Sequence, residues 1–320
     1  MIRRRLAPVF TASMPVVSLA LSGVVLGGCS GGVWGDYGHE ASRVVAMDVA
    51  ASPVFRLEGE VGDVRVSASP DADRISALVE LVGKGHSPEA ARDRLEEMNG
   101  TLHANATPGV VLASVTHPPV RGNTPYAAHW SVTVPEGTRV EIVSDVGDVS
   151  VIDTRGPVDI RTDVGDVWVS GVTDASVRGD VGDLSVCATG VVSVRADVGD
   201  VTACLLHTGE ASQSVATDVG DVYVVVVPSW SGELTARTDV GDVLVLDGAR
   251  GRVTGEDRLS VRLGADGSAT LLARTAVGDV TVVTDGDTAP MGAPPELTVP
   301  SATEEPAPLE RSEATSADRP

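Results

Sequence analysis

A three-residue motif, Val-Gly-Asp, recurs along this sequence with alternating apolar residues on either side. Its eight copies lie at 61–63, 146–148, 164–166, 181–183, 198–200, 219–221, 240–242 and 277–279. Beside the seven copies from 146 onward, every second residue is nearly always Val, Ile, Leu or Ala, which is the pattern of a strand with one buried face. Each of these copies therefore predicts two short strands joined at the motif.

The repeat has a nearly regular length from the second copy onward. The residue before each of these motifs is Asp at positions 145, 163, 180, 197, 218 and 239, and Ala in the last copy, at position 276. The steps between these positions are 18, 17, 17, 21, 21 and 37 residues, so the last step spans about two repeats. A degenerate copy at 255–263, which keeps the alternation but lacks Gly-Asp, fills that gap.

One such repeat cannot bury its apolar face by itself. Copies stacked about 4.8 Å apart would bury the apolar residues in continuous columns. We therefore predict an all-β fold, a β-solenoid of stacked 17–21-residue rungs that occupies residues 141–285.

The two turns of a rung differ in how constant they are. In Asp-Val-Gly-Asp, Gly at the third place supplies a positive φ, and Asp at the first place can accept a hydrogen bond from a backbone N–H downstream. The opposite turn varies in length, and its longer versions bring in His207 and Trp230. Such loops either carry recognition or simply tolerate insertions.

The two ends of the chain predict processing and anchoring. Three arginines, an apolar run and small residues lead to Leu26-Gly27-Gly28-Cys29, the order found in a lipoprotein signal. We predict a signal peptide at 1–28, a lipid on Cys29, a flexible tether at 29–42 and a disordered Pro/Glu/Ser/Thr tail at 286–320. The protein is then exported and held on the outer face of the cell membrane. An ordinary secretory signal with an incidental Cys29 is the alternative.

Residues 43–140 do not repeat, and we predict strands with a helical insertion at about 88–98. Ser87 is the predicted N-cap and Pro88 the first helical residue, with Leu95 and Met98 buried. The helix is expected to lie near the N-terminal end of the solenoid, which needs cover for its exposed strand edges.

The order of these features resembles a bacterial domain family of unknown function that is labelled putative adhesin. The resemblance spans about 43–285 and rests on "GEVGDVRV", a strand–helix–strand insertion, the entry "VTVPEGTRVEIVSDVGDVSV" and the Gly-Asp-Val rungs. It implies a β-solenoid protein of the envelope or cell surface, often membrane-anchored. The family has no established catalytic residues to carry over.

Stacked motifs would place acidic residues in columns, in a chain whose net charge is −21. Neighbouring carboxylates at rung spacing repel by roughly 1 kcal/mol in water. Calcium between rungs could offset this repulsion. The favoured alternative is backbone capping by Asp together with pairing to arginines two residues before the first Asp. These are Arg161, Arg178, Arg195, Arg237 and Arg274.

Two further predictions concern the strand that follows the motif. Cys187 and Cys204 each lie seven residues after their motif-opening Asp, so they stack on adjacent rungs and an inter-rung disulfide is possible in an exported protein. On this strand a set of apolar residues points outward. We expect the helix or the N-terminal strands to cover it, and the alternative is that it forms a binding face. Its members are Trp168, Tyr223, Val225, Leu244 and Leu246.

We therefore expect a non-enzymatic, lipid-anchored envelope protein that acts as an adhesin-like binding or envelope-sensing scaffold. The expected partners are the membrane, through the lipid on Cys29, and an unidentified envelope protein or glycan. The negative charge opposes nucleic-acid binding, and we expect no cofactor. A structural surface spacer and a carbohydrate-active β-helix enzyme are the alternatives, although Asp and Arg recur in rung after rung and do not form a single catalytic cluster.

Overall fold

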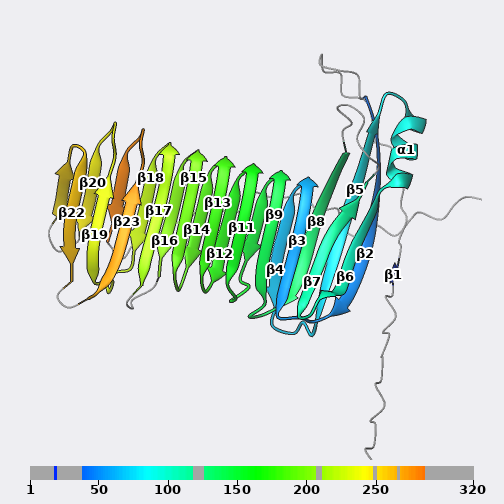
Figure 1. The fold of residues 1–320 in the computed structure, drawn as a ribbon, viewed down its shortest axis with the longest axis horizontal. Helices are drawn as coiled ribbons and strands as arrows, with labels where there is room; N and C mark the ends of the chain where they lie inside the picture. Colours follow the sequence, from blue (N-terminus) through cyan, green and yellow to red (C-terminus); the bar gives the residue numbers. More distant parts are fainter. Residues whose placement is uncertain are drawn as a thin grey trace, which may run out of the picture.

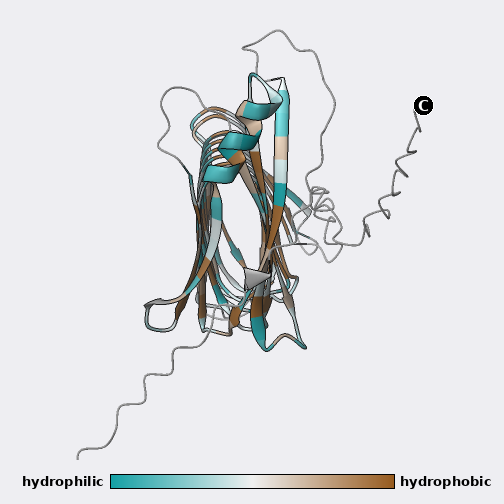
Figure 2. Cartoon of the chain, turned by 90° about the vertical axis from the view of Figure 1, so that its right-hand side faces the viewer, coloured by the Kyte–Doolittle hydropathy of each residue, from teal (hydrophilic) through white to brown (hydrophobic). Residues whose placement is uncertain are grey.

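The computed structural model describes residues 18–19, 38–117, 126–206, 211–247, 251–264 and 267–284. These residues are mostly in strands, with one helix among them, so the predicted all-β class is confirmed. The strands have mixed orientations and form two sheets that face each other as two layers (Figures 1 and 2). Except for two residues at 18–19, the predicted signal peptide lies outside the described residues, as do Cys29 and the tail at 286–320.

The first sheet has 13 strands within the described residues. In spatial order they are β1 (Ser18–Leu19), β2 (His39–Ala50), β5 (Arg74–Gly85), β8 (Tyr126–Pro135), β4 (Val64–Ser69), β10 (Val149–Ile152), β12 (Val167–Val172), β14 (Leu184–Ala188), β16 (Val201–Leu205), β18 (Val222–Val226), β24 (Val280–Val283), β20 (Val243–Asp247) and β21 (Gly251–Gly255). Every pair from β8 to β20 is parallel, and the pairs beyond them are antiparallel.

The second sheet has 11 strands within the same described ranges. In spatial order they are β22 (Arg258–Leu263), β19 (Gly232–Arg237), β23 (Ala269–Arg274), β17 (Ser212–Val219), β15 (Val192–Val198), β13 (Ala175–Val181), β11 (Val158–Val164), β9 (Arg139–Val146), β3 (Val54–Val61), β7 (Val110–Thr116) and β6 (Asn99–Thr107). The strands from β19 to β7 pair in parallel, and β22 and β6 close the two ends in antiparallel orientation.

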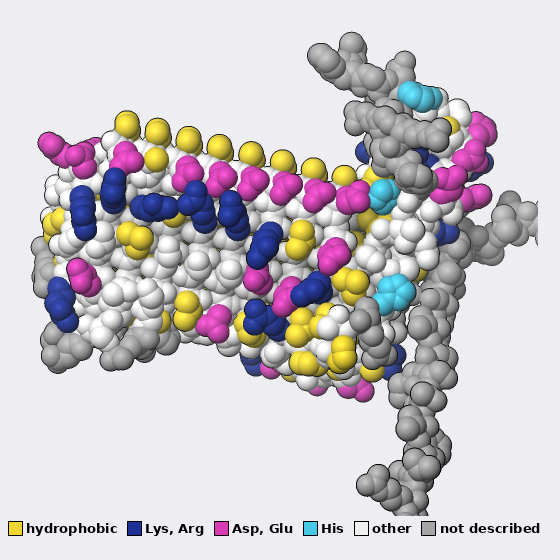
Figure 3. All heavy atoms as spheres, in the orientation of Figure 1, with side chains coloured by type: hydrophobic (Ala, Val, Ile, Leu, Met, Phe, Trp, Pro, Cys, Tyr) yellow, Lys and Arg dark blue, Asp and Glu magenta, His cyan; other side chains and the backbone are white. Residues whose placement is uncertain are grey.

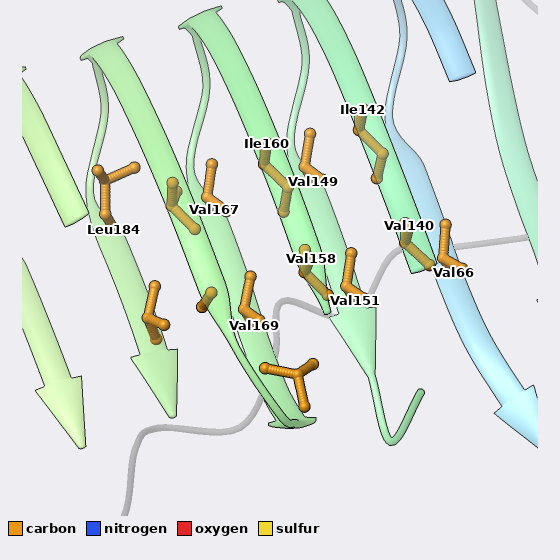
Figure 4. Close-up of a cluster of buried hydrophobic side chains, with 14 of the residues drawn as sticks. Val66, Val140, Ile142, Val149, Val151, Val158, Ile160, Val167, Val169 and Leu184 are labelled. Carbon is orange, nitrogen blue, oxygen red and sulfur yellow. The ribbon is translucent and has the colours of Figure 1, made fainter. Parts of the chain in front are cut away.

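The alternating residues of both sheets meet in the core, as the sequence pattern predicts. Equivalent side chains such as Val149, Val167 and Leu184 are direct register partners, so each column runs from one rung to the next (Figure 4). Gln213 is the polar exception and is buried. Its Oε1 accepts the Val192 N–H at 2.5 Å and its Nε2 donates to the Gly190 carbonyl at 3.2 Å. Gln213 thus provides hydrogen-bond partners for two backbone groups that lie just before the pairing of β15 with β17 begins.

The motif glycines have the positive φ that the turn predicts, between +131° and +143°. The structure adds a second requirement, which is close stacking of successive turns. A Cβ on Gly199 would lie 2.1 Å from the Gly182 carbonyl oxygen, and at the other seven copies it would meet a backbone oxygen at 2.1–2.3 Å. Each copy therefore needs Gly both for its conformation and for its distance to the preceding rung.

The rungs do not stack in sequence order at the C-terminal end, which corrects the simple sequential arrangement. Strands β23 and β24 carry the last motif and insert between β17–β18 and β19–β20. The degenerate copy contains β22, and β21 lies just before it; these strands pair antiparallel with β19 and β20 respectively and cover the edges of both sheets. The chain thus forms the end of the stack first, with β19 to β22. It then returns, and β23 and β24 pair between those strands and the earlier strands β17 and β18.

The helix α1 (Pro88–Glu97) lies at the opposite end and packs on β2 and β5 (Figure 1). As predicted, Ser87 is the N-cap and accepts the Ala90 N–H at 3.1 Å, and Leu95 and Met98 are buried. Gly83 on β5 allows the close approach, because a Cβ there would lie 2.6 Å from a helix carbonyl oxygen. Strand β2 begins at His39, inside the predicted tether, because it pairs with β5 along its whole length.

We predict that Gly199→Ala lowers the free energy of unfolding by about 2 kcal/mol or more, because it adds strain at positive φ to a clash with the adjacent backbone. Urea denaturation followed by circular dichroism measures this loss. Ser193→Ala, on the exposed face of β15, is the control and should change stability by less than about 0.5 kcal/mol. Equal midpoints for Gly199→Ala and the wild type would contradict the stacking requirement.

Candidate functional site

The eight Val-Gly-Asp turns lie in line along one edge of the two sheets, which we call the motif edge. The motif valines are partners in the parallel ladder from one copy to the next, in the spatial order Val61, Val146, Val164, Val181, Val198, Val219, Val277 and Val240. Figure 3 shows a continuous row of hydrophobic side chains along this edge, with rows of acidic and then basic side chains below it.

The motif valines are exposed, although valine is the main core residue elsewhere in the rungs. Their exposed fractions run from 36% at Val61 to 64% at Val240. We call these eight residues the valine ridge. The flanking alternation predicts the buried columns but says nothing of these valines, which stand inside the turn. Their recurrence in every copy is the signal that could have identified the ridge.

The last Asp of each motif connects neighbouring rungs. The Asp183 carboxylate accepts the Asp200 backbone N–H at 2.8 Å, and Asp166 accepts that of Asp183 at 2.8 Å. The same bond recurs at every step from Asp63 to Asp242, at 2.8–3.1 Å. Backbone capping is therefore confirmed, but its geometry differs from the prediction: the capping residue is the last Asp, and it caps the next rung, not its own turn.

His129 takes the place of Asp at the N-terminal end of this ladder. Its Nδ1 lies 3.2 Å from the Asp63 backbone nitrogen and 3.3 Å from the Asp63 carboxylate. The hydrogen bond with this carboxylate raises the pKa of His129, and the same bond lowers the pKa of Asp63. A neutral ring can accept the backbone N–H, whereas a protonated ring pairs with the carboxylate.

The arginines are paired with the first Asp column only in part. Arg195 lies 3.0 Å from Asp218 and 3.4 Å from Asp197, and Arg237 lies 2.8 Å from Asp239. The other three predicted partners, Arg161, Arg178 and Arg274, have no ion pair among the described residues. The prediction of a paired arginine column is therefore wrong for these three, because exposed ion pairs are too weak to immobilise every long side chain.

The acid columns are also where the sequence left calcium open as an alternative. Within the described ranges, no group of three or more His, Cys, Asp or Glu side chains is arranged to hold a metal ion. Every ladder carboxylate except the last, Asp242, accepts a backbone N–H, which offsets part of the repulsion within the column.

A set of buried threonine hydroxyls was not predicted. Thr217 and Thr275 donate to the carbonyls of Gly199 and Gly220 at 2.9 Å each, and Thr238 donates to Gly278 at 2.8 Å. They stand two residues before the motif valine, on the buried side of the strand. Thr recurring two residues before the motif valine is the signal that could have identified them.

Two predicted surfaces remain, which are the outward apolar set and the variable turns opposite the motif. Helix α1 packs on β2 and β5, so it does not cover the outward set on β12, β18 and β20. In that set Leu246 is exposed and Val225 is buried, and the other three, Trp168, Tyr223 and Leu244, are half-buried. Of the two variable-loop residues, Trp230 is buried and His207 lies outside the described residues.

Cys187 and Cys204 are direct register partners on β14 and β16, as the repeat predicts. Both are free thiols in this structure, so the predicted disulfide is not formed there. The hydrogen bond with Cys204, together with burial, raises the pKa of the Cys187 thiol. Parallel neighbours present their Cβ atoms side by side, which is poor geometry for a bridge. The bridge stays a prediction.

No family model and no curated protein matches this chain. Several solved structures are similar to it. A putative cell adhesion protein from Clostridium sporogenes is 12% identical, with 76% of this chain and 100% of that chain covered and a TM-score of 0.35. A putative adhesin from Bacteroides fragilis is 10% identical, with 75% and 97% covered and a TM-score of 0.32. One from Parabacteroides distasonis is 10% identical, with 76% and 97% covered and a TM-score of 0.27.

The helix α1 has ten residues and is the only helix among the described residues. At 1.5 Å per residue it reaches about half the thickness of a bilayer core, so no described helix could span a membrane.

We predict that Asp183→Ala costs about 1–2 kcal/mol of stability, since it leaves the Asp200 N–H without its carboxylate. Asp180→Ala, one column away on the same rung, removes an equal charge but no hydrogen bond between described residues, and should stay within about 0.5 kcal/mol of wild type. Paired denaturation curves measure the difference. Equal losses would mean that the column acts through charge alone.

We predict a pH-dependent contribution from His129. The raised pKa means that its pairing stabilises the fold below its usual value of 6.5 and is lost as the pH rises through the raised value. The lowered pKa of Asp63 gives stability above its usual 3.8, which is lost as the pH falls through the lowered value. His129→Gln should therefore lower the melting temperature more at about pH 5.5 than at about pH 9. An equal deficit at both pH values would argue against the pair.

Proposed function

We propose that the two-sheet stack is a β-solenoid and that it acts as a non-enzymatic binding scaffold of the cell envelope. The near-constant rung length and the parallel register from β7 to β19 and from β8 to β20 support the solenoid. The lipoprotein signal that ends at Cys29 supports anchoring on the outer face of the cell membrane. Nine residues lie between Cys29 and His39, where β2 begins, so we place the anchor at the end of the stack that carries α1.

The valine ridge is the observation that carries the binding function. Eight exposed valines in one unbroken line form an apolar strip with a length of about 34 Å at rung spacing. Apolar strips rimmed by charge mark interaction sites on soluble proteins. A structural spacer would need the buried columns and the ladder, but it has no need of this ridge.

The charges beside the ridge favour a basic partner. In the sequence an acid such as Asp163 or Asp180 precedes most ridge valines, and the ladder Asp follows each of them two residues later. Figure 3 shows a row of acidic side chains beside the ridge. A second copy of the edge would meet like charge, and so would the chain's own tail at 286–320, which has seven acids and two arginines. We therefore propose an extended partner chain that carries both basic and apolar groups.

The ridge can be tested without disturbing the core. A variant with Val→Thr at Val164, Val181, Val198 and Val219 keeps the shape of each side chain and removes apolar surface. Its binding to isolated cell envelopes of the source bacterium should fall at least about tenfold in a pelleting assay. The control is Val191→Thr, which is 45% exposed in the opposite turn and should bind as wild type does.

Competition identifies the class of partner. A basic peptide with alternating lysine and leucine should displace the protein from envelopes, and an acidic peptide with alternating glutamate and leucine should not. Unchanged binding of the four-valine variant would overturn the ridge as the binding surface. Displacement by both peptides would overturn the basic partner.

A further inference from the structure

A cavity of about 370 Å³ lies at the end of the motif edge, where the repeating turns stop. It opens to solvent and is lined by the ends of β3 and β7, the starts of β4 and β8 and the end of β9. Among its lining residues are Glu60, His117, Tyr126, Trp130 and Asp145. Asp145 belongs to the repeating acidic column, but Glu60, His117, Tyr126 and Trp130 have no counterparts in the repeats, so the cavity is a single feature. Its volume lies within the range of small-molecule sites.

Glu60 is held in place by two aromatic side chains. The Tyr126 hydroxyl donates to its carboxylate, and His117 Nε2 lies 3.0 Å from the same oxygen. The rings of His117 and Tyr126 stack with centroids 4.5 Å apart. The hydrogen bond from Tyr126, followed by that from His117, lowers the pKa of Glu60, which keeps this carboxylate charged. More than half of its side chain stays exposed, so a ligand can still reach it.

Asp145 adds a second carboxylate whose charge is not offset. Burial, followed by repulsion from Asp163 and Glu60, raises its pKa. No ion pair or hydrogen bond of its carboxylate is recorded within the described part of the chain. Arg56, on the same strand as Glu60, forms an ion pair with Glu141 and does not line the cavity. A cation in the cavity would therefore relieve a repulsion that the protein alone leaves in place.

The rest of the wall is mostly apolar. Val61, Val64, Val115 and Val143 line it together with the indole of Trp130. Apolar walls beside two carboxylates suit a cation with an apolar body, because the body can stay in contact with the wall while the charge meets the acids. Within the described residues the acids are not grouped to hold a metal ion, which separates this ligand from a divalent cation.

We propose that this cavity binds an organic cation, an ammonium or guanidinium group on an apolar body. Glu60 is the oriented anchor, and Asp145 is the acid that gains most from the bound charge. Val61 is the one member of the valine ridge that lines the cavity, and the four-valine variant keeps it, so the cavity can be tested separately from the proposed function. The ligand is either a free small molecule or the arginine side chain of a partner chain.

The test is isothermal titration of the full mature chain with phenylguanidinium and with its neutral isostere phenylurea. Phenylguanidinium should bind saturably, and phenylurea at least about tenfold more weakly. Asp145→Asn should weaken phenylguanidinium binding at least about tenfold, and Glu60→Gln should do the same. Asp180→Asn, two rungs along the same acidic column, is the matched control and should leave binding unchanged.

A second pair of probes separates the two sources of the cation. The tripeptide Gly-Arg-Gly and its neutral citrulline analogue differ only in charge. Tighter binding of Gly-Arg-Gly than of phenylguanidinium assigns the site to a partner's side chain, and the reverse order assigns it to a free cation. Asp145→Asn removes no recorded hydrogen bond, so its fold should be intact. Absence of saturable binding by both cations, or equal effects of Asp145→Asn and Asp180→Asn, overturns the proposal.

Discussion

The contact between successive motif glycines is the constraint on which the rest of the structure depends. A carbonyl oxygen lies where the Cβ of the next glycine would be, so neighbouring turns approach as closely as backbone permits. This fixes the rung spacing at the motif edge. Because the last Asp of each turn then faces the next Asp N–H, the same contact creates the carboxylate ladder. Strand register follows, and with it the alignment of valine, isoleucine and leucine in the core columns.

The same geometry decides the chemistry of the surface. A turn that places Gly against its neighbour directs the preceding valine to solvent, so a structural repeat produces a valine ridge as long as the stack. It also aligns like charges, which the protein tolerates because one acidic column is hydrogen-bonded to backbone and some members of the other are paired with arginine. The way the rungs are held together therefore exposes the position before each motif Gly, whereas the valine at all eight of these positions is not required by the stacking.

The ends of the stack are where repetition gives way to individual features. At one end β21 and β22 reverse direction and cover the edges of both sheets. At the other, α1 packs on β2 and β5, and His129 replaces the missing Asp of the ladder. The cavity around Glu60 and Asp145 lies beside this second end. It lies where the row of motif turns ends, and residues from five strands line it.

The sequence by itself determined the strands, the helix with its Ser87 cap, the need for Gly in each turn and the pairing of Cys187 with Cys204 in register. Each depends on local periodicity or on one residue's conformational range, and both can be read from the local sequence. The tertiary structure alone decided which Asp caps which rung, why Thr217 is buried, and that β23 and β24 insert between earlier rungs. These outcomes depend on contacts between residues 17 to 58 positions apart, and the local pattern is the same for every order in which equivalent rungs could stack.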